Sequence, residues 1–240
     1  MRVELLGAYI DDLNMDETVE KAAEFIRSGR PHRVITLNPE YLYRAQARRE
    51  LLDLVNSADL VTADGTGIVW ACKIAGRPVK ERVTGIDLML HLCARGGYEG
   101  WRVFLLGAAP GVAEEAAERL KQQNPGLVIA GTHHGYFTDA ESGRIVEMIR
   151  RAGPHILFVA LGAPRQEQWI ARYQPRIGVP VAIGVGGSFD VISGRKKRAP
   201  RWMQRLKIEW LYRLIKEPSR FKRQLVLPKF ALLVLRRYLV

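Results

Sequence analysis

The sequence has little of what marks disulfide-rich, zinc-bound or membrane-spanning proteins. Its 240 residues include two cysteines, Cys72 and Cys93, both in apolar helical surroundings. This count excludes a disulfide framework and a Cys-rich zinc site, and it suits a reducing compartment. No apolar run approaches the roughly 20 residues that a membrane span requires. The N-terminus turns acidic after a short apolar stretch, so no secretory signal is expected.

The dinucleotide-binding glycine motif is also missing. Gly107 and Gly111 flank a turn that follows an apolar strand pattern and precedes a helical pattern. The turn lacks the G-x-G-x-x-G spacing of NAD-binding proteins. We keep phosphate binding at Gly107, near the start of the following helix, as an expectation. An NAD-type nucleotide-binding protein remains an alternative.

Positive charge is concentrated at the C-terminal end. Residues 195–240 contain 15 Lys and Arg but two acids, Glu209 and Glu217, whereas residues 1–194 contain 22 basic and 23 acidic residues. A near-neutral body with a strongly basic end indicates an anionic partner. That partner is nucleic acid, a phosphate compound or the anionic lipid of a cytoplasmic leaflet.

Apolar residues recur at helical spacing within this basic segment. They are Trp202, Leu206, Trp210, Leu211, Leu214 and Ile215. Basic amphipathic helices with Trp and Leu on one side are typical of helices that lie on a membrane surface. Packing on its own domain or on a second subunit, and nucleic-acid binding, are the alternatives. We therefore predict a core over residues 1–194 and a basic amphipathic appendage over residues 195–240.

Short β-branched runs alternate with helical patterns through the first 194 residues. We predict strands at Val34–Leu37, Leu60–Ala63, Val103–Leu106, Leu127–Gly131, Ile156–Leu161 and Val181–Val185. We predict helices at Glu40–Ser57, Gly67–Gly76, Asp87–Ala94, Ala113–Gln123, Asp139–Ala152 and Arg165–Tyr173. This alternation indicates an α/β fold of the Rossmann-like kind, with a mostly parallel sheet and helices on both faces. The basic helical appendage follows it.

Ligands of such sheets bind beyond the carboxyl ends of the strands, and polar residues gather there in this sequence. Thr36 and Asn38 are two apart and point to one side of an extended chain. Asn38 before Pro39 also has the pattern of a helix cap. Asp64 lies at the end of the next predicted strand. It is either a carboxylate in the ligand crevice or a residue that caps the following helix or closes an Asx turn. Arg82 is well suited to a diphosphate, with a surface charge as the alternative.

Three later loops add candidates. Gly186 and Gly187 let backbone N–H groups approach an anion, and Asp190 can accept ribose hydroxyls. Tyr136 can stack on a base. The adjacent His133 and His134 point opposite ways on a strand, which disfavours a shared metal ion.

Six blocks of the sequence, in order and without a large gap, resemble the bacterial WecG/TagA/CpsF glycosyltransferases. They are TLNPEYL, ADGTGIVW, RVTGIDL, FVALGAPRQEQWI, GVGGSFDVISG with the following RAP, and EWLYRLIKEPSR. Members of that family transfer N-acetylmannosamine, or its uronic acid, from a UDP-sugar to polyprenol-diphosphate-linked N-acetylglucosamine. The resemblance leaves open which of the two sugars is carried. It also leaves open the polymer, a teichoic acid linkage unit, an enterobacterial-type antigen or a capsule.

The resemblance implies roles for residues of the core. Asp64 is expected to be the catalytic base, with Thr36 and Asn38 beside it. Arg82 and Gln166 are expected around the donor, Tyr136 on the uracil base and Asp190 on the ribose. In the family the C-terminal segment docks on the membrane and brings arginines over the active site. The corresponding residues here are Arg213, Arg220 and Arg223.

The resemblance also implies partners and a location. The partners are a UDP-sugar, a polyprenol-diphosphate acceptor and an anionic membrane surface, with a homo-oligomer possible and no nucleic acid expected. We expect a peripheral protein on the cytoplasmic face of the plasma membrane. No Asp-x-Asp motif occurs in the sequence, so we expect no metal and no other cofactor. The leaving diphosphate would then be met by Arg side chains and backbone N–H groups, in a single displacement with inversion.

Overall fold

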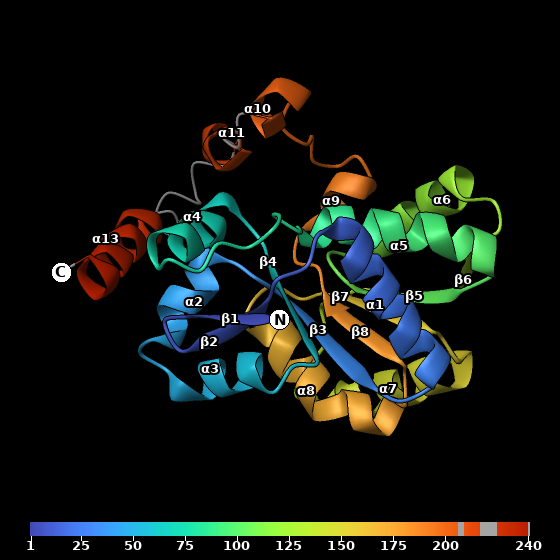
Figure 1. Ribbon diagram of the computed structural model, residues 1–240. Coiled ribbons are helices and arrows are strands. Elements are labelled where there is room, and N and C mark those ends of the chain that lie inside the picture. The colour runs from blue at the N-terminus through green and yellow to red at the C-terminus, as the bar shows by residue number, and fades with distance from the viewer. Residues whose placement is uncertain (206–208, 217–224, 240) are drawn as a thin grey trace.

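The computed structural model describes residues 1–205, 209–216 and 225–239 (Figure 1). Six parallel strands form its central sheet. In spatial order they are β4 (Leu60–Ala63), β3 (His32–Leu37), β8 (Val181–Gly184), β7 (Ile156–Ala160), β5 (Arg102–Gly107) and β6 (Val128–His133). Every neighbouring pair is parallel. Strands β4, β7 and β8 are buried throughout, as expected of a sheet that is covered on both faces.

Helices connect the strands and cover both faces of the sheet (Figure 1). They are α1 (Met15–Ser28), α2 (Pro39–Ala45), α3 (Arg49–Asn56), α4 (Thr66–Ile74), α5 (Gly85–Glu99), α6 (Val112–Gln123), α7 (Ser142–Ala152), α8 (Arg165–Ile177) and α9 (Ser188–Ile192). A short 3-10 turn, η1 (Asp139–Glu141), precedes α7, and an antiparallel hairpin of β1 (Arg2–Leu5) and β2 (Ala8–Asp11) begins the chain. The predicted α/β, Rossmann-like fold with a parallel sheet is confirmed.

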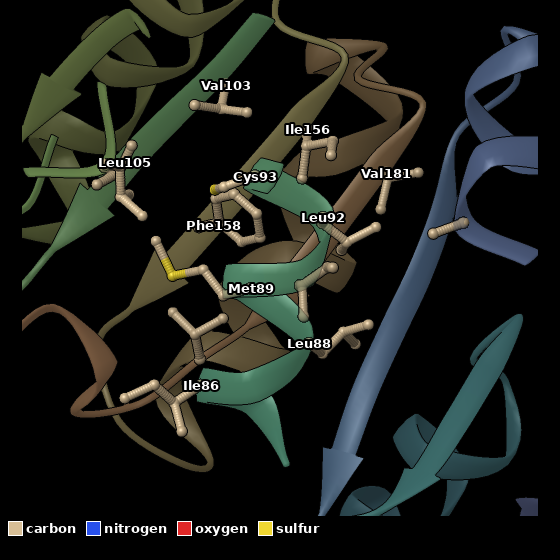
Figure 2. Close-up of a cluster of buried hydrophobic side chains, with 14 of the residues drawn as sticks. Ile86, Leu88, Met89, Leu92, Cys93, Val103, Leu105, Ile156, Phe158 and Val181 are labelled. Atoms are coloured by element: carbon tan, nitrogen blue, oxygen red, sulfur yellow. The ribbon is translucent and has the colours of Figure 1, made fainter. Parts of the chain in front are cut away.

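Alternate residues of each strand pack into different core clusters, because successive side chains of a strand point to opposite faces. Val103 and Leu105 of β5 face α5, while Phe104 and Leu106 join the cluster beneath α7 and α8. Figure 2 shows Met89 and other apolar side chains of α5 seated on the strands. These two layers fix where each strand ends, and so they fix the loops that follow.

The C-terminal segment contains α10 (Arg201–Arg205), α11 (Glu209–Lys216) and α13 (Val226–Tyr238). Helix α13 packs against α2 and α4, and its Phe230 and Val234 are buried in the same cluster as Leu42 and Ile68. The Tyr238 hydroxyl accepts a hydrogen bond from the Leu6 N–H at 2.8 Å. The last helix is therefore anchored on the body, while the predicted boundary at residue 194 stays a prediction. None of the described helices is long and apolar enough to cross a membrane.

Several elements differ from the sequence predictions. The helix predicted over Glu40–Ser57 is two helices, α2 and α3. The helical conformation is interrupted before α3 at Arg48, whose backbone is extended. Nearby, the Gln46 side chain donates a hydrogen bond to the Leu6 carbonyl at 3.1 Å and so ties this corner to the hairpin. The hairpin, α1 and α9 were not predicted. The 3-10 turn replaces the first residues of the helix predicted to begin at Asp139.

Candidate functional site

A cavity of about 700 Å³ lies at the carboxyl edge of the sheet, where β3, β4 and β8 end. Its volume is in the range of pockets that hold small ligands. One part of its wall is polar and comes from the loops after these strands. Another part is apolar and comes from α4, α11 and the start of α13.

The polar wall contains the first three residues that the sequence singled out. The Thr36 hydroxyl donates a hydrogen bond to the Gly184 carbonyl at 3.2 Å. The Asn38 side chain accepts from the Tyr41 N–H at 2.9 Å, so Asn38 caps α2 and also lines the cavity. Asp64 Oδ2 accepts a hydrogen bond from the Gly85 N–H at 3.1 Å. This bond aims the carboxylate along the first turn of α5.

Gln166 crosses from α8 to the glycine loop after β8. Its Oε1 accepts hydrogen bonds from the N–H groups of Gly162 and Gly186, at 3.2 and 3.1 Å. Gln166, Gly186 and the neighbouring Gly187, which are three of the predicted site residues, line the cavity. The side chain therefore joins two of the loops that form the polar wall.

Arg82 also lines the cavity, and a network of charges holds it. Its Nη1 donates to Glu209 Oε2 at 3.0 Å, and Glu209 Oε1 accepts from Arg198 at 3.3 Å. Arg198 forms a bidentate pair with Asp87, at 2.7 and 2.9 Å. Burial raises the pKa of Asp87, but the hydrogen bonds from Arg198 and Thr84 outweigh it, and the pKa lies below its ordinary value. The network ties the C-terminal segment to the rim of the site.

Helix N-termini surround the same space. The first residues of α2, α4, α5 and α9 all contribute to the wall. Gly67 lets α2 and α4 approach closely, because a Cβ atom there would lie 2.7 Å from the Pro39 ring. Each N-terminus presents backbone N–H groups and the positive end of a helix dipole. The cavity is therefore well suited to a phosphorylated, anionic ligand.

The apolar wall was not predicted. Its large side chains are Trp70, Trp210, Leu227, Pro228 and Phe230. Glu209, at the rim of this wall, could have been singled out from the sequence, because it is one of two acids in the basic segment. No comparable local signal marks Trp70 or Phe230.

The structure leaves several predicted residues outside this wall. Among the described residues, Gly107, Tyr136 and Asp190 do not line the cavity. A Cβ atom at Gly107 would collide with the Ala160 backbone at 2.5 Å, so this glycine serves close strand packing. Tyr136 is 74% exposed, and Asp190 lies on α9. Arg213 lies on α11, and Arg220 and Arg223 fall outside the described residues.

Within the described parts of the chain, no group of three or more His, Cys, Asp or Glu side chains is arranged to hold a metal ion. Cys93 is fully buried, and burial raises the pKa of its thiol to about 12. The cavity lining includes three carboxylates, an arginine, two carboxamides and helix N-termini.

Ligands of open α/β sheets bind beyond the carboxyl ends of the strands, which is where this cavity lies. The chain matches the family described as Glycosyl transferase WecG/TagA/CpsF family over residues 3–240, and it belongs to that family of glycosyltransferases.

Two bacterial relatives illustrate the similarity. A protein of Bacillus spizizenii is 39% identical over 203 residues, 85% of this chain and 78% of the relative. A protein of Staphylococcus aureus (strain MW2) is 36% identical over 231 residues, 95% of this chain and 90% of the relative. Both are named N-acetylglucosaminyldiphosphoundecaprenol N-acetyl-beta-D-mannosaminyltransferase. The resemblance noted from the six sequence blocks is thereby confirmed.

Proposed function

We propose that this glycosyltransferase moves N-acetylmannosamine from a UDP-sugar to N-acetylglucosamine linked to a polyprenol diphosphate, in the assembly of a cell-surface polysaccharide. The observation that carries the proposal is one cavity with two unlike walls. Asp64, Arg82 and four helix N-termini face it from the polar side, and Trp70 and Phe230 face it from the apolar side. A lipid-linked sugar diphosphate also has a polar part, the sugar and diphosphate, and an apolar part, the lipid, so each part has a matching wall.

Asp64 is the proposed general base. The acceptor hydroxyl must lose a proton as its oxygen attacks the anomeric carbon of the donor. A carboxylate within hydrogen-bond reach can take that proton. The Gly85 N–H donates to Asp64 Oδ2 at 3.1 Å, which holds the carboxylate at the wall of the cavity. Attack from the side opposite the nucleotide inverts the anomeric carbon.

The leaving nucleotide diphosphate gains negative charge as the sugar departs. Arg82 and the N–H groups at the helix N-termini are the proposed partners of that charge. We propose that transfer proceeds without a metal ion on this basis. Tyr136 and Asp190 remain candidates for the uridine, and Arg213, Arg220 and Arg223 for the diphosphates, as the family resemblance implies.

The apolar wall gives the acceptor its orientation. With the sugar at Asp64, the first isoprene units would lie against Trp70 and Trp210, and the rest of the lipid would lead out beside α13. Trp202 and Ile215 of the C-terminal segment are 59% and 64% exposed, amid basic residues that favour an anionic surface. We propose that this segment rests on the inner face of the plasma membrane, where the lipid acceptor is confined.

A panel of donors tests the proposal. Purified protein is incubated with a short-chain polyprenol-diphosphate N-acetylglucosamine and with UDP-N-acetylmannosamine, its uronate, UDP-N-acetylglucosamine or UDP-glucose. Disaccharide formation is followed by mass spectrometry. We expect product from the first donor, or from its uronate. Product from the glucose donors alone, or from none of the four, would contradict the proposal.

A further inference from the structure

Glu167 is a buried carboxyl group next to the site. It is the third residue of α8, and its exposed fraction is 5%. Its Oε2 has no hydrogen-bond partner among the described residues. Its Oε1 accepts a hydrogen bond from Gln166 Nε2 at 2.8 Å. The protein retains this buried carboxyl group although burial of an unpartnered polar atom lowers the free energy of unfolding.

The bond to Glu167 decides which way the Gln166 carboxamide points. A carboxamide can be turned so that its oxygen and its NH2 group exchange places. With Nε2 held by Glu167, Gln166 Oε1 must face the Gly162 and Gly186 N–H groups, and it accepts from both. The reversed orientation would set an NH2 group against those two donors.

The backbone at Gly184 passes close to the Gln166 side chain. A Cβ atom at Gly184 would lie 2.5 Å from Gln166 Nε2 and 2.9 Å from its Cδ. Gly186 itself has a positive φ of 53°, and it needs the hydrogen bond to hold that turn. The loop after β8 is thus shaped by Gln166, and Gln166 is oriented by the carboxyl group beneath it.

We propose that Glu167 is a positioning residue of the transferase, which orients Gln166 and through it fixes the glycine loop, Gly186 and Gly187, that forms the donor side of the cavity. It touches neither substrate. This inference rests on the proposed function for the role of the loop. The orientation of Gln166 can be tested without any substrate.

The surroundings of Glu167 agree with that role. Burial raises its pKa to about 7, and the hydrogen bond from Gln166 offsets this only in part. The pKa of Tyr41, on α2, is also raised. Its burial is the largest cause, followed by the charges of Glu167 and of Glu50 on α3. A carboxyl group that stays largely protonated below neutral pH avoids a buried charge.

Two substitutions separate orientation from simple packing. Glu167→Gln keeps the shape and an acceptor oxygen for Gln166 Nε2, whereas Glu167→Leu keeps the bulk and removes the acceptor. In protein labelled with 15N-glycine, we expect the Gly162 and Gly186 amides to be protected from hydrogen exchange in the wild type and in Glu167→Gln. In Glu167→Leu we expect their protection to fall at least about tenfold, which is the loss of roughly one hydrogen bond. Unchanged protection in Glu167→Leu would overturn the proposal.

The kinetic consequence is specific to the donor. For Glu167→Leu we expect the donor KM to rise about tenfold and kcat to fall about tenfold or more, since small displacements of positioning groups have effects of this size. The acceptor KM should stay within about twofold, and Glu167→Gln should restore the wild-type values. A fall in kcat that leaves both KM values unchanged and tracks the loss of folded protein would mean a purely structural role and would overturn the proposal.

Gln174→Leu is the matched control. Gln174 is a buried residue of the same helix, and it donates to the carbonyls of His32 and Val179, away from the cavity. We expect this variant to unfold at a lower temperature with an unchanged donor KM. If the wild type transfers no sugar at all, the proposed function fails, while the glycine-amide measurement still decides whether Glu167 orients Gln166.

Discussion

Arg82 and Glu209 are 127 residues apart in the chain, yet Arg82 Nη1 donates a hydrogen bond to Glu209 Oε2 at 3.0 Å. Their side chains are 20% and 11% exposed, so the pair is largely shielded from water. An arginine of the core is thus engaged by an acid of the basic C-terminal segment. A nucleotide diphosphate that enters the cavity would compete with Glu209 for that arginine.

Substitution of either partner should have opposite effects. Arg82→Ala should lower kcat/KM by about 100-fold, because it removes a cation that meets the developing charge. Glu209→Gln should tighten UDP binding about threefold to tenfold at low salt, and less at high salt, because it removes a competing anion. The transfer assay measures the first effect, and calorimetric titration with UDP measures the second. Glu147→Gln, an exposed acid of α7 that pairs with Arg150, should leave UDP binding unchanged. Weaker UDP binding by Glu209→Gln would contradict the competition.

Asp64→Asn tests the proposed base. The amide oxygen can still accept the Gly85 N–H, so the loop should be retained while the proton acceptor is lost. We expect kcat to fall by about 10²–10⁴-fold, with the affinity for UDP within about threefold of the wild type. Asp53→Asn, on the exposed side of α3, serves as the control and should be fully active. Near-normal turnover of the Asp64 variant would show that another group takes the proton.

The buried Glu167 carboxyl predicts a pH dependence of stability. Its pKa in the folded protein is about 7, above its ordinary value of 4.5. The folded state therefore binds more protons than the unfolded state between these values, and the free energy of unfolding should fall as pH rises from about 4.5 to about 7. The full shift corresponds to about 3 kcal/mol. Urea denaturation at pH 5 and pH 8 should show a smaller fall for Glu167→Gln than for the wild type. Equal falls in the two proteins would contradict the assignment.

Membrane attachment can be separated from folding by surface substitutions. Because α13 contributes Phe230 and Val234 to the core, deletion of the C-terminal segment would disturb the fold as well as the docking. Trp202→Glu combined with Ile215→Glu should weaken binding to vesicles of anionic phospholipid about tenfold or more, since two exposed apolar side chains lose their contact with lipid. Tyr98→Glu, which changes an aromatic residue that is 95% exposed on α5, is the control. Vesicle sedimentation measures the difference, and equal binding by both variants would refute the docking role.

Removal of divalent cations tests the proposed metal-free transfer. We expect activity within about twofold of the untreated enzyme after EDTA, because arginine and helix N-termini are proposed to meet the diphosphate charge. The transfer assay is run with and without added Mg²⁺. Abolition by EDTA with recovery on Mg²⁺ addition would show that a metal ion takes part.

Much of the fold was predictable because its signals are local. Strands such as Leu60–Ala63 are short apolar runs that end at polar or glycine-rich loops, and the structure has that strand over the same residues. Asn38 was predictable as both a cap and a lining residue, because a cap at a strand end is also at the ligand edge. Helix α1 was missed although Asn14 and Glu17 form a capping box, a signal that spans three residues and can be read from sequence.

The parallel α/β sheet and the polar residues at its carboxyl edge could be predicted from local patterns, because the alternation of residue types and the strand–loop order act over short distances in the chain. The remaining features depend on long-range contacts of the folded chain. Tertiary structure set Glu209 on Arg82, and it placed Phe230 in the core beside Leu42 and Ile68. Each of these depends on which segments meet after the chain folds back, and residues so far apart carry no shared period or spacing that would mark them as neighbours.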